Sequence, residues 1–129
     1  MRYLIFIRGN PSHSRFLAQL EKCVNFVNKE KREEDGIAMF NDATHVAPLP
    51  KREELKKLLH EVQRGDVVVM DQLSSISTDS EELITIYSQI VRKGATIYSV
   101  QEHHVDEDNF RFHLLMQDTK PKNKKRRKP

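Results

Sequence analysis

One arginine and several serines are the side chains of this sequence whose positions suggest chemistry. Arg8 directly follows the apolar run Tyr3–Ile7, and a guanidinium at the end of a buried strand can bind a phosphate or a carboxylate through two hydrogen bonds. A salt bridge to Asp42, or to another acid at the edge of a sheet, explains the same arginine equally well. The sequence alone leaves both interpretations open.

Serine hydroxyls become nucleophiles only when a base or a phosphate-binding cluster activates them. The serines in polar or turn-forming segments are Ser12, Ser14, Ser74, Ser75 and Ser77. No activating base is visible near them in the sequence. We therefore expect these hydroxyls to cap helices and to form hydrogen bonds within loops.

The sequence contains no motif that indicates binding of a cofactor or a metal. Neither GxGxxG nor GxxxxGK[ST] occurs, so common forms of nucleotide binding are not indicated. His103 and His104 would diverge on a strand, and a solvated loop explains them more simply than a metal site with Asp106. Cys23, the single cysteine, lies among apolar helix positions and is expected to be inert core. We expect no cofactor and no metal.

The elements that must position these residues alternate between strand and helix. Continuous apolar runs predict buried strands at 3–7, 37–40, 67–70 and 95–100. Apolar residues at helical spacing predict helices at 14–30, from about 51 to 62, from near 78–82 to 93, and at 107–118. This order predicts one α/β domain with a mainly parallel sheet of four to five strands and helices on both faces.

In such a sheet the functional crevice lies at the carboxyl ends of the strands. The segments expected there are 8–14, 41–50, 71–78 and 102–106. They contain Arg8 and most of the candidate serines, so the predicted fold brings the chemically interesting residues to one edge.

Positive charge is concentrated at the C-terminus. The 129-residue chain has a formal net charge of +3, but the body carries 15 basic and 19 acidic side chains, a net charge of −4. We predict a domain at 1–118 and a solvated basic arm at 119–129 that contacts nucleic-acid phosphates. The basic residues of the arm are Lys120, Lys122, Lys124, Lys125, Arg126, Arg127 and Lys128.

The sequence has no apolar run of membrane-spanning length and no signal-peptide pattern at its N-terminus. We expect a cytoplasmic protein associated with the nucleoid or a nucleoprotein, or a nuclear one in a eukaryotic cell, with no membrane partner.

Several short motifs follow one another between residues 3 and 106. They are Phe6-Ile7-Arg8-Gly9-Asn10-Pro11, Gln19-Leu20, Phe40-Asn41-Asp42, Arg52-Glu53-Glu54-Leu55, Gly65-Asp66-Val67-Val68-Val69, Leu73-Ser74-Ser75-Ile76-Ser77-Thr78, Gly94-Ala95-Thr96-Ile97 and Glu102…Asp106. In order and spacing they resemble the N-terminal catalytic domain of the serine site-specific recombinases, the resolvase and invertase family. The resemblance implies a resolvase-like α/β fold.

The resemblance also places the family's active-site positions on this sequence: Arg8, Asn10, Asp42, Arg52, Ser74, Ser75 and Thr78. Arg8 and Arg52 match family arginines that surround the scissile phosphate. Asn10 stands where the family has its nucleophilic serine, and the last three positions replace an aspartate and two arginines. These departures imply the loss of the family's cleavage mechanism, because a carboxamide cannot form the covalent phosphoserine link.

Two further departures concern the C-terminal part. The family's long dimerisation helix would begin near residue 107, where the sequence allows only a short helix before Pro121. The basic arm then stands in place of the family's helix-turn-helix domain.

The resulting hypothesis is a catalytically inactive relative of serine recombinases. It would bind nucleic acid, DNA in preference to RNA, or a nucleoprotein partner through its arm, with Arg8 and Arg52 as a residual phosphate site. The negative body argues against the fold itself as the main DNA surface. Alternatives are an accessory protein of an RNA–protein particle, an active recombinase whose nucleophile has moved to Ser12 or Ser14, and a module that forms homo-oligomers or mixed dimers with an intact recombinase.

Overall fold

A computed structural model describes residues 1–9, 14–42 and 52–118 of the chain. The strands are β1 (Arg2–Arg8), β2 (Gly36–Asp42), β3 (Val67–Met70), β4 (Thr96–Ser99) and β5 (His103–Val105). The helices are α1 (Ser14–Glu30), α2 (Glu53–Glu61), α3 (Ser80–Arg92) and α4 (Glu107–Asp118), and a short 3₁₀ turn spans Leu73–Ser75. Asn10, Ser12 and the basic arm lie outside the described residues.

The strands form one five-stranded sheet in the order β2-β1-β3-β4-β5. The first four strands are parallel, and β5 pairs antiparallel with β4. Along the β1–β2 pair, Arg8 lies opposite Asp42, so two candidate residues end neighbouring strands. The predicted α/β class and mainly parallel sheet are confirmed.

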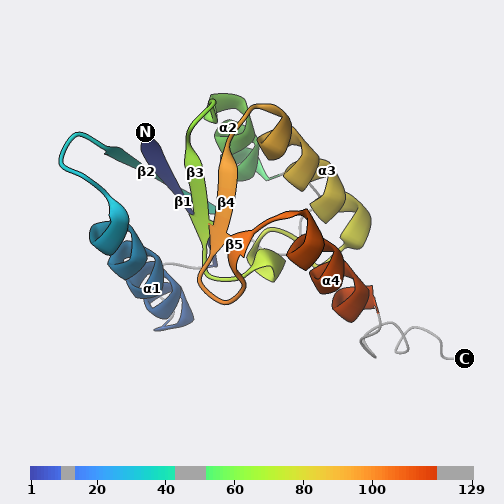
Figure 1. The fold of residues 1–129 in the computed structure, drawn as a ribbon. Coiled ribbons are helices and arrows are strands. Elements are labelled where there is room, and N and C mark those ends of the chain that lie inside the picture. The colour runs from blue at the N-terminus through green and yellow to red at the C-terminus, as the bar shows by residue number, and fades with distance from the viewer. Residues whose placement is uncertain (10–13, 43–51, 119–129) are drawn as a thin grey trace, which may run out of the picture.

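The two faces of the sheet are covered unequally (Figure 1). Tyr3, Ile5 and Ile7 of β1 pack toward α1 in the smaller core, which also contains Cys23. Leu4 and Phe6 point the other way, into a larger core built with α2, α3 and α4. The uninterrupted apolar sequence of β1 is therefore explained by burial on both faces, as predicted.

The segment that follows β4 differs from the prediction. Residues 103–105 were expected to form a solvated loop, but they form β5 at the edge of the sheet. Only Val105 of this strand is buried, and His103 adopts a positive φ of 67° where the turn from β4 ends. The strand is too short and too polar to show a strand pattern in the sequence.

No helix of the described residues combines the length and the apolar character needed to cross a lipid bilayer.

Candidate functional site

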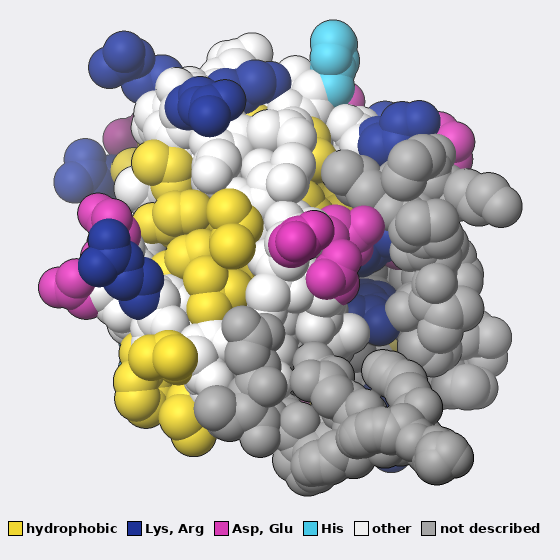
Figure 2. Space-filling view, turned by 90° about the vertical axis from the view of Figure 1, so that its right-hand side faces the viewer, with side chains coloured by type: hydrophobic (Ala, Val, Ile, Leu, Met, Phe, Trp, Pro, Cys, Tyr) yellow, Lys and Arg dark blue, Asp and Glu magenta, His cyan; other side chains and the backbone are white. Residues whose placement is uncertain are grey.

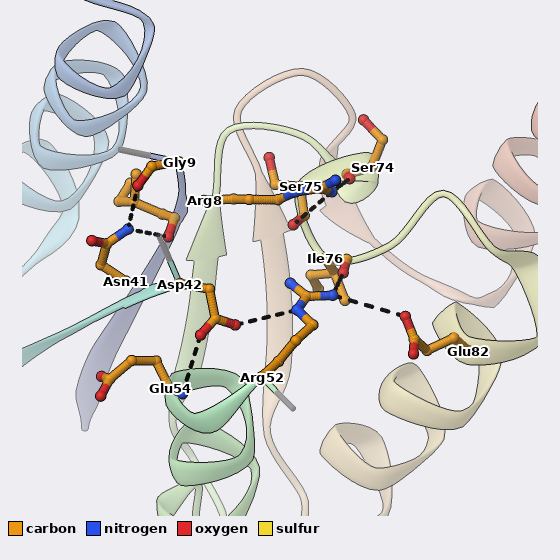
Figure 3. A network of polar contacts seen from close by, with 11 residues as sticks. Arg8, Gly9, Asn41, Asp42, Arg52, Glu54, Ser74, Ser75, Ile76 and Glu82 are labelled. Atoms are coloured by element: carbon orange, nitrogen blue, oxygen red, sulfur yellow. Dashed lines mark hydrogen bonds and ion pairs between the residues drawn. The ribbon is translucent and has the colours of Figure 1, made fainter. Parts of the chain in front are cut away.

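The candidate residues meet at the carboxyl ends of β1 and β2 and at the segment that follows β3 (Figure 3). The strand order reverses between β1 and β3, which is where open α/β sheets place their binding crevices. Arg8, Asp42, Arg52, Ser74 and Ser75 are brought together there, as the sequence predicts.

Asp42 joins the end of β2 to the start of α2. Its Oδ1 accepts a hydrogen bond from the backbone N–H of Glu54 at 3.1 Å, and its Oδ2 accepts one from Nε of Arg52 at 3.2 Å. The carboxylate thus compensates the positive N-terminal end of α2. Asp42 and Arg52 are 5% and 3% exposed, so this ion pair lies inside the domain.

Arg52 ties four parts of the chain together. Its Nη1 donates to the carbonyl of Ile76 and lies 3.8 Å from Oε1 of Glu82 on α3. Its guanidinium carbon lies 5.7 Å from the centre of the Phe6 ring on β1. Its Nη2 is buried and has no hydrogen-bond partner among the described residues. Arg52 therefore acts mainly as an internal cross-link.

Arg8 holds the segment after β3 from the other side. Its Nη1 donates to the carbonyl of Ser74 at 2.7 Å and approaches that of Ser75 at 3.4 Å. Burial, and then the nearby charge of Arg52, lower the pKa of Arg8, while Glu82 and Asp42 act in the opposite direction. Backbone carbonyls are thus among the partners of Arg8, and neither interpretation of the sequence had named them.

The hydroxyl-rich segment is mostly buried. Ser75 and Ser77 are buried, Ser74 is half-buried, and Thr78 is exposed. The Ser77 hydroxyl accepts a hydrogen bond from the backbone N–H of Asp79 at 3.0 Å, just before α3 begins. For Ser77 the predicted role in loop hydrogen bonding is confirmed.

Comparison with known proteins fits this geometry. The family model for the resolvase N-terminal domain matches residues 10–120. The chain belongs to the resolvase family. A resolvase from Clostridium perfringens is 39% identical over 57 residues, which cover 44% of this chain and 30% of that protein. A resolvase from Clostridium perfringens strain 13 is 36% identical over 56 residues and is likewise covered over 30% of its length.

Solved structures share the resolvase-like fold. The N-terminal catalytic domain of TP901-1 integrase superposes with a TM-score of 0.67 at 11% identity, over 97% of each chain. The C-terminal catalytic domain of ISC1926 TnpA, an IS607-like serine recombinase, gives 0.60 at 17% identity, over 78% of this chain and 70% of that one. A resolvase family recombinase from Streptococcus pneumoniae gives 0.57 at 12% identity, over 97% and 88%. At these identities the likeness concerns the fold.

Two amide side chains of this resolvase domain were not predicted as site residues. Asn41 donates from Nδ2 to the carbonyls of Ile7 and Gly9, at 2.9 and 3.1 Å. Gln19 donates from Nε2 to the carbonyl of Arg8 at 3.0 Å. Both hold the end of β1, and both belong to motifs that carry the family resemblance, which was the only signal in the sequence.

Glu102 forms a second polar network at this edge. Its Oε1 accepts hydrogen bonds from the Ser99 hydroxyl and, at 3.0 Å, from the backbone N–H of Leu73. Its Oε2 lies 3.7 Å from Nδ1 of His113 on α4. The 3₁₀ turn is therefore held by Arg8 and by Glu102, and Arg52 binds the carbonyl of Ile76 directly after it.

Cys23 and the potential metal ligands complete the candidate residues of the resolvase domain. Cys23 is buried, so its predicted core position is confirmed, and burial raises the pKa of its thiol to about 12. Within the described residues, no three His, Cys, Asp or Glu side chains are placed to bind a metal ion.

Proposed function

We propose that this resolvase-family domain binds nucleic acid through its basic arm and does not cleave it. The observation that carries the proposal is the use of Arg8 and Arg52, the two arginines that match the family's phosphate-binding positions. Both donate to backbone carbonyls of residues 74–76. Guanidinium groups held by internal carbonyls stabilise the fold, which is a different role from binding a scissile phosphate.

The residue types at the remaining family positions support the absence of cleavage. Stabilising the charge that develops on a phosphate in the transition state requires preorganised donors, and losing one such donor typically costs about 3 kcal/mol. Ser75 and Thr78 supply hydroxyls where the family has arginines, and Asn10 supplies a carboxamide where it has the nucleophile. Catalysis would have to survive all of these changes together.

The arm supplies the affinity in this proposal. Its seven cations lie within residues 120–128, directly after the segment that ends α4. Contacts to phosphates fix a protein on nucleic acid without reading sequence. We expect the arm to bind duplex DNA in preference to structured RNA. The bound arm then holds the domain at 1–118 at the nucleoid or at another nucleoprotein.

A protein contact is also part of the proposal. Phe112, Leu115 and Met116 of α4 are 63%, 64% and 50% exposed, and together they form an apolar strip on the helix that leads to the arm. Large exposed apolar side chains at i, i+3 and i+4 are typical of a helix that packs on a partner. A second copy of this chain, or an intact recombinase, is the occupant we expect.

The experiment compares the full chain with a full-length variant whose seven arm cations are changed to Gln. Fluorescence anisotropy with labelled duplex DNA and with a structured RNA gives affinities across a salt series. The seven arm cations should contribute about −6 to the slope of log K against log salt on duplex DNA. The arm variant should lose most of this slope, and an unchanged slope would overturn the proposal. Tighter binding to the RNA would favour the accessory role in an RNA–protein particle.

A further inference from the structure

A groove between α2 and α3 opens at the end of the domain opposite the candidate site. It has a volume of about 640 Å³ and is lined by Lys56, Leu59 and His60 of α2 and by Gln89, Arg92 and Lys93 at the end of α3. Figure 2 shows Lys, Arg and His side chains at the top of this face, the end where α3 finishes in Figure 1.

The polar side chains that line the groove come from two rows, one from each helix. Lys56 and His60 are four residues apart on α2, so they lie along one face of that helix. Gln89 and Arg92 are three residues apart on α3, and Lys93 directly follows this helix. Leu59 is buried between the helices and forms the apolar floor. Lys56 on one wall and Arg92 on the other place positive charge on both sides of an open groove, which suits the phosphates of a backbone.

Lys93 connects the two helices that form the groove. Its Nζ donates to the carbonyls of Leu59 and His60 at 2.7 and 3.2 Å, and so it caps the end of α2. The chain then turns at Gly94, whose φ is +85°; a Cβ built there would lie 3.1 Å from Cγ of Arg64. The turn therefore needs glycine, and it places the stem of Arg64 beside the end of α3.

Arg92 and Lys56 are exposed cations in the lining of the groove. Arg92 is exposed, and no hydrogen bond or ion pair joins it to another residue in the described part of the chain. Lys56 lies 4.0 Å from Glu53, an exposed acid whose attraction in water is weak. Cations of this kind exchange water and counterions for phosphates readily.

From this arrangement we infer that the α2–α3 groove is a second nucleic-acid contact, which binds the phosphate backbone at the end of the domain away from the arm. The inference rests on the proposed function for its class of ligand and extends binding from the arm to the folded domain. The net charge of −4 of the body gave no indication of this surface, because it sums the cations of the groove with acidic side chains that lie elsewhere.

The test uses two matched double variants of the full chain. The groove variant carries Lys56→Gln and Arg92→Gln, and the control carries Lys29→Gln and Arg32→Gln, which remove two exposed cations at the end of α1. Both lose the same net charge. Anisotropy with labelled duplex DNA should show that the groove variant has a salt slope smaller by about 2 than the unmodified chain, and that the control keeps the original slope. Equal slopes for the two variants would overturn the groove.

The arm variant separates this inference from the proposed function. If the groove binds backbone, combining the groove and arm substitutions should remove the salt-dependent binding that the arm variant retains. If the arm variant binds like the unmodified chain while the groove variant loses affinity, the arm proposal fails and the groove stands. If the arm variant loses affinity and the groove variant behaves like its control, the groove fails and the arm stands. Circular dichroism of all variants checks that each remains folded.

Discussion

At the carboxyl end of the sheet, Arg8 and Arg52 turn into the domain and donate to the carbonyls of residues 74–76. At the other end, Lys56 and Arg92 line an open groove between α2 and α3. The first pair occupies the positions where the family resemblance places phosphate contacts. The second pair lies where no motif draws attention.

The difference shows that the surroundings of a cation, rather than its type, decide its use. A buried guanidinium loses its hydration and must find fixed acceptors inside the fold, so it stabilises the structure that surrounds it. An exposed ammonium or guanidinium keeps its water and its counterions, and it can exchange both for phosphates. We therefore infer a structural role for Arg8 and Arg52, and the binding role of the groove remains our proposal.

Breaking the buried pair should have the largest effect on stability. Asp42→Ala removes the nearer and more buried of the two carboxylates that face the buried charge of Arg52, and it removes the acceptor of the Glu54 N–H. We expect the free energy of unfolding to fall by about 3–5 kcal/mol, measured by urea denaturation. The exposed Asp108→Ala is the control and should change stability little. A loss no larger than that of the control would show that the pair does not brace the fold.

Removing Arg8 should have an intermediate effect. Arg8→Met keeps much of the side-chain volume but leaves the carbonyl of Ser74 without its donor. Hydrogen bonds from charged groups contribute about 1.5–3 kcal/mol, and we expect a loss in that range by the same measurement. Arg15→Met, on the exposed part of α1, serves as the control. If the Arg8→Met variant is as stable as the control variant, Arg8 does not stabilise the fold and is available to bind a ligand.

Lys93 is the structural cation of the groove, and replacing it should lower the stability less than replacing Arg8. Lys93→Met removes the donor to the last carbonyls of α2, which should cost about 1 kcal/mol in thermal or urea unfolding. Lys93→Arg restores a donor and should recover part of the loss. Equal effects of Met and Arg would mean that the contact to the carbonyls contributes nothing.

The exposed groove cations should affect stability least. Lys56→Gln with Arg92→Gln should shift the free energy of unfolding by no more than about 0.5 kcal/mol, because both side chains lie at the surface. The same double change should lower the affinity for duplex DNA. A large loss of stability would mean that these cations brace the fold as Arg52 does, and the contrast between the two ends would disappear.

Most of the fold was predictable because periodicity reports burial. The apolar run of β1 signals burial on both faces, and helical spacing around Cys23 signals a core position, as the structure confirms. β5 was missed because three residues with one buried side chain carry no pattern.

The site was predictable in its location but not in its contacts. Arg8 and Asp42 end two strands of the predicted parallel sheet, whose carboxyl ends share one edge; that these two strands are paired comes from the structure. The carbonyls that accept from Arg8 and Arg52 belong to backbone, and residue types do not reveal backbone partners. The groove was missed for a related reason, since Lys56 and Arg92 are far apart in the sequence and adjacent only when α2 packs near α3.

The central claim is binding without cleavage, and one measurement tests both parts. The full chain is incubated with a pool of nicked duplexes of random sequence that trap covalent protein–DNA intermediates, and the products are separated with and without denaturant. We predict complexes in low salt that dissociate in high salt and leave no adduct after denaturation. An adduct that survives denaturant and disappears in Ser12→Ala or Ser14→Ala would contradict the account and establish an active recombinase with a displaced nucleophile.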